Sequence, residues 1–327
     1  MISCIAAFQV HSGSGGIVGY FPDSSLYSTA IQQSEDATSE TVLSIWSPDR
    51  GVLLQRREYD FKVTAALSSD GRYLAWGSGS LRGQLRLIHC SGREPDRNFL
   101  VSDVVDDDVS VDDITFIPGT NDLMFICDDR WWRWNITTDW PGVQLDNRIN
   151  CLLAVSPDGL RMALVPAGVQ SLEIEYWIVK SGEAGPISRV APPETGGRKA
   201  VWHPNQPILA TCGYWGEGIE VWDFSCSPSP IRVFHQPGGY THMAFLPDGR
   251  LVTCHESGEI AIWSVNSSKK LASASTLGVQ EYQLLQGSDQ IIITDVSSSV
   301  VHISVAPNGR NIAAMTTSGT VVFFEIN

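Results

Sequence analysis

Aspartate residues are concentrated in one short stretch of the chain. Six of the eleven residues from 103 to 113 are aspartates, namely Asp103, Asp106, Asp107, Asp108, Asp112 and Asp113. Gathered carboxylates can hold calcium, but the ligand alternation and the glycine of a calcium loop are missing here. The stretch therefore predicts a solvated acidic loop, with a docking patch for a basic segment as the functional alternative and no metal site.

A second group of residues combines acids, an arginine and aromatic rings. It consists of Asp128, Asp129, Arg130 and Trp131, and it is followed directly by Trp132, Arg133 and Trp134. Tryptophan and arginine are over-represented at interface hot spots. Side chains alternate along a strand, so Trp132 and Trp134 share one face and Trp131 and Arg133 share the other. Core packing is the more ordinary role of such rings. Because Arg130 and Trp131 lie beside a turn, both are also candidates for binding.

Motifs for catalysis are weak. Cys254 and His255 are neighbours in an apolar stretch, so in a strand their side chains point to opposite faces and cannot form a nucleophile and base pair. The histidines show no ligand spacing with cysteines that would indicate zinc. No GxSxG, phosphate-binding loop or HExxH motif occurs. We therefore expect no cofactor and no metal, although an active site assembled from distant segments would escape this kind of reading.

The elements that must position these residues are repeated hairpins. The clearest copy runs from Trp202 to Phe224, where a turn at His203–Asn205 and a glycine-rich turn separate short apolar stretches. Such punctuation between apolar runs is typical of hairpins. Equivalent turns recur at Pro22, Ser69, Pro118, Pro157, Pro204, Pro247 and Pro307. Their spacing of 39 to 60 residues fits a period of about 40–45 for four-stranded propeller blades.

Each turn is followed by an apolar strand and then, in most copies, by a strand with an aromatic residue near its end. Examples are Trp46, Trp134, Trp177, Trp222, Trp263 and Phe324. With these features the whole chain resembles the WD-repeat β-propeller family. The copies are degenerate, because only Trp222–Asp223 keeps the Trp-Asp pair and no Gly-His pair is present. The resemblance implies an all-β, seven-bladed propeller of four-stranded antiparallel blades that forms one domain over residues 1–327.

The two ends of the chain complement each other in this arrangement. Residues 2–10 form an apolar stretch with no partner nearby, while the last repeat ends after its third strand. We expect residues 1–10 to be the outer strand of the last blade and to close the ring, which removes exposed sheet edges. The long interval before the last repeat predicts an extra outer hairpin that includes residues 291–294. A polar insertion at residues 32–40 is expected to form a loop.

The resemblance also implies a place for function. The turns between second and third strands would share one end of the ring, which groups Asp128, Asp129, Arg130 and Trp131 with Tyr214, Trp215, Glu217, His255 and Glu256. The favoured function is a non-catalytic scaffold that binds a protein or peptide at this end. The second is an enzyme at the channel mouth, with Asp128, Asp129, Glu217, His255 and Glu256 as its acid–base groups. The third is a carbohydrate-binding propeller with Trp131 and Trp215 as stacking platforms.

Composition limits the partners and the compartment. The 36 acidic against 22 basic residues give a formal charge of −14, which argues against nucleic acid and allows a basic partner. No apolar run is long enough to cross a membrane, and residues 1–8 lack the basic start of a signal peptide. Three of the seven cysteines, Cys127, Cys212 and Cys254, occupy equivalent places, as buried free thiols would. We expect a reducing cytoplasmic or nuclear location and a monomeric propeller within a complex.

Overall fold

A computed structural model describes most of the chain, which divides into two compact units. Unit 1 combines residues Met1–Tyr59 with Gly238–Asn327, and unit 2 comprises Asp60–Pro237. The described residues are almost entirely in strands, with one short 3₁₀ helix at Val101–Asp103. They are 2–9, 14–23, 25–33, 39–47, 51–58, 63–78, 83–91, 94–103, 109–127, 130–138, 143–147, 151–166, 174–178, 188–190, 199–212, 218–225, 230–234, 239–277, 280–284, 291–295 and 299–327.

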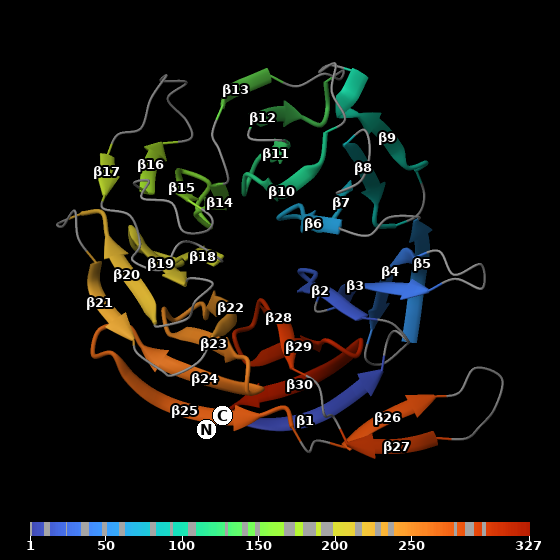
Figure 1. Ribbon diagram of the computed structural model, residues 1–327, viewed down its shortest axis with the longest axis vertical. Coiled ribbons are helices and arrows are strands. Elements are labelled where there is room, and N and C mark those ends of the chain that lie inside the picture. Colours follow the sequence, from blue (N-terminus) through green and yellow to red (C-terminus); the bar gives the residue numbers. More distant parts are fainter. Residues whose placement is uncertain are drawn as a thin grey trace. The chain divides into compact units, whose positions relative to one another are not determined.

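Unit 2 contains four antiparallel sheets of four strands, and each sheet uses consecutive strands in chain order (Figure 1). The first has β6 (Val63–Leu67), β7 (Tyr73–Ser78), β8 (Gln84–His89) and β9 (Arg97–Leu100). The second has β10 (Val111–Phe116), β11 (Asp122–Cys127), β12 (Arg130–Asn135) and β13 (Val143–Asn147). The third has β14 (Cys151–Val155), β15 (Arg161–Pro166), β16 (Ile174–Ile178) and β17 (Ser188–Val190). The fourth has β18 (Lys199–Trp202), β19 (Ile208–Cys212), β20 (Ile219–Asp223) and β21 (Pro230–Phe234).

Unit 1 contains two four-stranded sheets and one six-stranded sheet. One four-stranded sheet has β2 (Ser14–Tyr20), β3 (Leu26–Gln33), β4 (Ser39–Ser47) and β5 (Gly51–Glu58). The other has β22 (Tyr240–Phe245), β23 (Leu251–His255), β24 (Glu259–Ser264) and β25 (Lys269–Ser275). The six-stranded sheet has the order β27-β26-β1-β30-β29-β28, with β1 (Ile2–Gln9), β26 (Gln280–Leu284), β27 (Ile291–Asp295), β28 (Val300–Val305), β29 (Asn311–Thr316) and β30 (Thr320–Ile326).

The two ends of the chain meet in the six-stranded sheet. Strand β1 pairs antiparallel with β30, from Ile2 opposite Ile326 to Gln9 opposite Thr320. Ile2 and Ala7 are buried in the apolar cluster that they share with residues of β22–β24 and β28–β30. The prediction that the N-terminal strand joins the last repeat is therefore confirmed.

Strands β26 and β27 form an antiparallel hairpin beyond β1, as the long interval before the last repeat predicted. The hairpin joins the sheet beside β1 (Figure 1). The contact is parallel, and in it Phe8 lies opposite Tyr282. The polar insertion is only partly a loop, which corrects the prediction. Gln32 and Gln33 continue β3, and Ser39 and Glu40 begin β4, because these residues pair across the two strands. Residues 34–38 lie outside the described residues.

The turn signals found in the sequence lie between the first and second strands of each four-stranded sheet, and between β28 and β29. In several of them a glycine adopts a positive φ that other residues rarely reach, such as Gly159 at 67° and Gly309 at 68°. At Asp158 the carboxylate accepts hydrogen bonds from the Ser156 hydroxyl and from the Leu160 N–H, at 2.5 and 2.9 Å. In these hydrogen bonds the Asp158 side chain acts as the acceptor in place of a backbone carbonyl, and they stabilise the turn.

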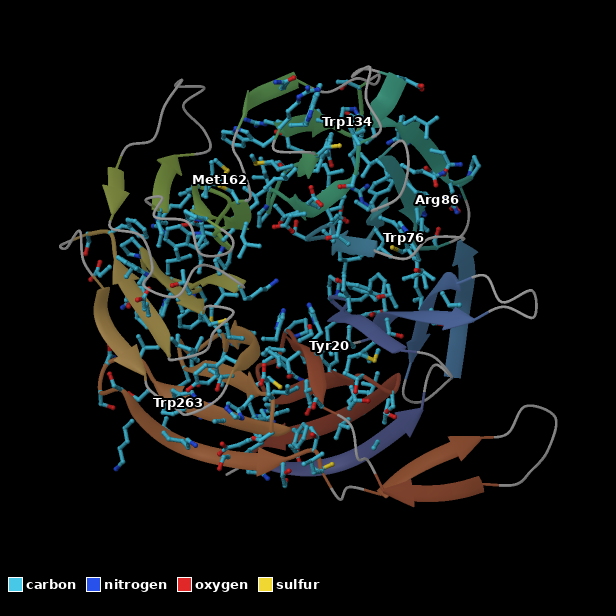
Figure 2. The ribbon with its side chains drawn as sticks, viewed as in Figure 1. Tyr20, Trp76, Arg86, Trp134, Met162 and Trp263 are labelled. Carbon is cyan, nitrogen blue, oxygen red and sulfur yellow. The ribbon has the colours of Figure 1, made fainter. Side chains whose placement is uncertain are left out.

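The core lies between neighbouring sheets of each unit. Two tryptophans bond to a threonine on the preceding strand of the same sheet: Trp222 donates to the Thr211 hydroxyl at 3.1 Å, and Trp263 donates to the Thr253 hydroxyl at 2.8 Å. Trp263 is labelled in Figure 2. Cys127, Cys212 and Cys254 are all buried near the ends of second strands, as their equivalent spacing predicted. Among the described residues, no helix has the length and apolar character needed to cross a membrane.

Candidate functional site

The turn between β23 and β24, residues 256–258, forms part of one edge of unit 1. His255 ends β23, and its Nδ1 accepts a hydrogen bond from the Ser257 N–H at 3.0 Å and lies 2.7 Å from the Ser257 hydroxyl. Its ring is 9% exposed and meets the Tyr240 ring edge to face at 5.9 Å between centroids. Thus His255 braces the turn from beneath, and the neighbouring residues form its outer surface.

Glu256 is exposed and lies where this turn meets the next sheet. Its backbone N–H donates to the Gly239 carbonyl at 2.9 Å, and its own carbonyl accepts the Ser299 hydroxyl at 3.1 Å. The Glu256 carboxylate lies against the backbone of Gly239, because a Cβ built on that glycine would come within 2.4 Å of Oε1. A fixed backbone therefore presents this negative charge at the junction of two sheets.

Leu277 places a large apolar side chain against Gly258, in the same turn as Glu256. It is 46% exposed, and only Leu271 among the large apolar residues of the described chain is similarly exposed. The preceding residue, Thr276, is fully buried and is held by the Gly258 carbonyl through its N–H at 2.9 Å and its hydroxyl at 3.1 Å. Leu277 also packs close to Gly258. The leucine is thus exposed on a well-held backbone, which suits an anchor for a partner.

The turn between β29 and β30, in the last repeat, lies on the same edge. The Thr317 N–H donates to the Ser299 carbonyl at 2.8 Å, and the Ser318 hydroxyl lies 3.0 Å from that of Thr316. Gly319 has a positive φ of 80°, which lets this turn close tightly. We define the turn surface as the exposed residues of this edge, Glu256, Ser257, Leu277, Ser299, Thr317 and Ser318.

Sequence reasoning found only part of the turn surface. It identified Glu256, which is exposed, and His255, whose ring instead supports the turn. It missed Leu277, Ser299, Thr317 and Ser318. The available signal for Leu277 was an apolar residue two positions after strand β25. Whether such a residue is buried depends on neighbouring sheets and not on its own repeat.

Trp131 is a core residue, which corrects its place among the candidate binding residues. It is 3% exposed and packs in a cluster between two sheets of unit 2. The cluster consists of Ile117, Met124, Ile126, Trp131, Leu153, Met162 and Leu164, of which Met162 is labelled in Figure 2. The neighbouring sheet covers the face of β12 on which Trp131 lies. The ring therefore cannot serve as a platform for carbohydrate.

Of the other candidate residues in unit 2, the structure describes only Arg130. Arg130 begins β12, opposite Cys127 and Asn147, and is partly exposed. Trp215, the proposed platform for carbohydrate, lies outside the described residues. The proposed acid–base groups also lie outside them, except His255 and Glu256. The candidates outside them are Asp128, Asp129, Tyr214, Trp215 and Glu217.

The acidic stretch divides into residues of different roles. Asp103 is exposed at the end of the short 3₁₀ helix, and the exposed Asp112 accepts the Ser110 hydroxyl at 3.1 Å. Asp106, Asp107 and Asp108 lie outside the described residues. Two of the six aspartates are thus placed on the surface.

Asp113 differs from its neighbours and is corrected from a patch residue to a structural one. Its Oδ2 accepts the Leu153 N–H of β14 at 3.0 Å, and its Oδ1 accepts the Ile114 N–H at 2.9 Å. Burial raises the pKa of Asp113, although the Lys199 charge and these two N–H groups oppose the rise. Its carboxylate therefore links β10 to β14 and is not free to bind a basic partner.

A histidine pair was not foreseen from the sequence. His242 of β22 and His302 of β28 lie with ring centroids 3.8 Å apart, and the Ile303 N–H donates to His242 Nδ1 at 3.4 Å. The two strands belong to different sheets of unit 1, so no spacing within one repeat could pair these residues. The contact joins the first strands of two neighbouring sheets.

Cys254 is a buried thiol in the part of the chain that the structure describes. Burial raises the pKa of Cys254 to about 12, so this thiol stays protonated near neutral pH and is a poor nucleophile. No group of three or more histidine, cysteine or acidic residues is arranged to hold a metal ion within the described ranges. The turn surface offers an apolar anchor, hydroxyl groups and a carboxylate, which are contacts suited to a protein surface.

Comparison with known proteins gives a partial similarity. The chain matches no protein-family model. It is 30% identical to telomerase Cajal body protein 1 of Mus musculus over 132 residues, or 38% of this chain and 22% of that protein. Telomerase Cajal body protein 1 of Mesocricetus auratus is 27% identical over 152 residues, or 45% of this chain and 23% of that protein. The matched segment spans less than a quarter of the length of these relatives.

Proposed function

We propose that this protein is a non-catalytic scaffold that binds a protein partner through the turn surface. The observation that carries this proposal is the exposure of Leu277 on a backbone fixed by buried Thr276 and by Gly258. Large apolar side chains held rigidly at a surface lose little conformational entropy when a partner covers them. A surrounding rim of polar groups, here Glu256 and Ser299, is the usual composition of a protein interface.

The proposed partner presents an apolar residue together with basic residues. Glu256 supplies a fixed carboxylate in the turn against which Leu277 packs, and the chain carries a formal charge of −14. Complementary charge increases the rate of association and disfavours acidic partners. A basic segment with one apolar side chain therefore fits the turn surface better than an acidic one.

The larger architecture proposed for this function is a single closed ring. The six four-stranded sheets and the six-stranded sheet would be seven blades of one WD-repeat-like propeller over residues 1–327, with β1 completing the last blade. Closure would leave no unpaired first or last blade, which suits a monomeric repeat protein within a complex. The all-strand fold and the recurring turn positions support this architecture.

The relatives add support for assembly with other macromolecules in the nucleus. Their name links them to telomerase and to the Cajal body, which is a nuclear structure. We place this chain with the same kind of role, as an interaction component in the nucleus. We propose that the partner is a protein of such an assembly, because the acidic charge of this chain disfavours direct contact with an RNA backbone.

The test compares two equally exposed leucines. Leu277→Arg and Leu271→Arg are expressed as tagged proteins in the cells that make this protein, and co-purifying proteins are quantified. Leu271 is 49% exposed on the outer strand β25, so it is a matched control for the change of side chain. We expect Leu277→Arg to reduce recovery of specific partners by about tenfold or more, with Leu271→Arg equal to wild type. Equal recovery with all three proteins would contradict the turn surface as the binding site.

A further inference from the structure

The outermost strand of the six-stranded sheet, β27, has an edge that no described strand covers. It pairs antiparallel with β26 on one side, from Ile291 opposite Leu284 to Asp295 opposite Gln280. In the strand order β27 is the end of the sheet, so among the described residues its other edge has no strand partner. The hairpin is an addition to the four-stranded pattern of the other sheets.

The sequence of β27 can be compared with that of the fourth strand in each four-stranded sheet. Natural edge strands usually avoid pairing with other chains by carrying lysine, other charges or proline. Lys269 and Lys270 lie in β25, Pro230 and Arg232 in β21, and an arginine in each of β5, β9 and β17. Strand β13 carries Asp146. Strand β27 reads Ile-Ile-Ile-Thr before its last residue, Asp295; like β13 it has no basic residue or proline, but it begins with three consecutive isoleucines.

The backbone of β27 is suited to accept another strand. In an antiparallel pair, successive residues direct both backbone groups alternately toward the partner strand and away from it. Of Ile292 and Ile293, one therefore directs its N–H and C=O to β26, and the other directs both to the open edge. β-branched residues favour the extended conformation that a further ladder requires.

Charge favours a basic segment of another protein over a second copy of this chain. Glu281 on β26 lies opposite Thr294, and Asp295 ends β27, so the two strands of the hairpin contain acidic residues and no basic one. Two copies, each with a formal charge of −14, would repel each other.

We propose that β27 binds an extended basic segment of a partner protein by β-strand addition. Backbone hydrogen bonds to the open edge would supply affinity, and lysine or arginine residues of the partner would complement the acidic composition of the hairpin. None of these residues belongs to the turn surface, so this second interaction does not depend on the first.

The test uses a fluorescein-labelled synthetic peptide, Lys-Val-Thr-Val-Lys-Val-Arg, with the full-length protein. Fluorescence anisotropy measures its affinity for wild type and for the Ile292→Pro and Ile293→Pro proteins. Proline removes one N–H, so the variant that loses the outward N–H should bind the peptide about tenfold or more weakly, with an unchanged unfolding temperature. The other variant loses an N–H directed at β26 and serves as the matched comparison.

Two modified peptides keep the proposal testable if a variant protein does not fold. A peptide of the same charge with proline in place of the central valine should bind about tenfold or more weakly, because it cannot complete the ladder. A peptide with glutamate in place of its basic residues should also bind more weakly. Equal binding of the proline peptide would overturn strand addition, and equal binding of the glutamate peptide would overturn the basic partner. Self-association of wild type in sedimentation that Ile292→Pro or Ile293→Pro abolishes would overturn the proposal in favour of a second copy.

Discussion

Replacing Asp113 with alanine removes the carboxylate that connects β10 to β14. The Leu153 N–H, which donates to Asp113 Oδ2 at 3.0 Å, then loses its side-chain acceptor. Leu153 is 8% exposed, so little water can reach its backbone in compensation. A buried donor left without an acceptor costs about 1–3 kcal/mol. We expect the free energy of unfolding to fall by about this amount under acidic conditions, in which the carboxyl contributes most.

The pH dependence of this loss has a definite sign. Burial raises the pKa of Asp113 in the folded protein, in opposition to Lys199 and the N–H groups of Leu153 and Ile114. A raised folded pKa means that the stability contributed by the carboxyl is complete below its unfolded pKa, about 3.9, and is lost as the pH rises through the folded pKa. The difference in unfolding free energy between wild type and Asp113→Ala should therefore become smaller as the pH rises.

Urea unfolding followed by tryptophan fluorescence, at pH values from about 4 to 8, measures this difference. Asp113→Asn is the matched control, because its amide keeps one acceptor oxygen and has no charge to desolvate. We expect Asp113→Asn to lie between wild type and Asp113→Ala at the acidic end. A difference that increases with pH, or an alanine variant as stable as wild type at every pH, would refute the role assigned to Asp113.

Three further predictions concern the fold. Trp131→Ala should lower the free energy of unfolding by about 3–5 kcal/mol in urea titrations, because the ring is 3% exposed within a seven-residue cluster; unchanged stability would contradict its burial. Removal of residues 1–10 takes β1 from its pairing with β30 and should lower the unfolding temperature, so an unchanged temperature would count against ring closure. Gly258→Ala should cost more in thermal unfolding than Gly119→Ala. Both glycines have positive φ, but a Cβ at Gly258 would lie 2.7 Å from Thr276 Oγ1 and one at Gly119 meets nothing within 4 Å; equal losses would show that the clash is relieved.

The repeat made the strands and turns predictable from sequence. Residues such as Pro157, Asp158 and Gly159 determine a turn locally, since the side-chain hydrogen bonds and the positive φ involve only neighbours. The pairing of β1 with β30 was predictable for a different reason. The last repeat lacked a strand and the first residues supplied one, so the count of strands replaced any local signal.

The surface residues were less predictable because exposure depends on neighbouring sheets. Alternation correctly separated the face of Trp131 from that of Trp132, yet it could not show that Met162 and Leu164 of the next sheet cover Trp131. Leu277 is the opposite case, an apolar residue that no neighbouring sheet buries. The contact of His242 with His302 likewise depends on two strands from different repeats.

The acidic stretch shows the same limit within one motif. Asp112 and Asp113 are adjacent and chemically identical, but Asp112 is exposed and Asp113 accepts the N–H of Leu153 from another sheet. Alternation along β10 predicts that the two point in different directions. It does not predict which of them meets a backbone donor, because that depends on how β14 packs beside β10.

Site-specific photo-crosslinking in cells tests the scaffold proposal most directly. A photoreactive amino acid replaces Leu277 in one protein and the equally exposed Leu271 in another, and crosslinked proteins are separated and identified. The account predicts discrete adducts with a partner protein from position 277 and none of these adducts from position 271. The same adducts from both positions, or none from position 277, would contradict the claim that the turn surface binds the partner.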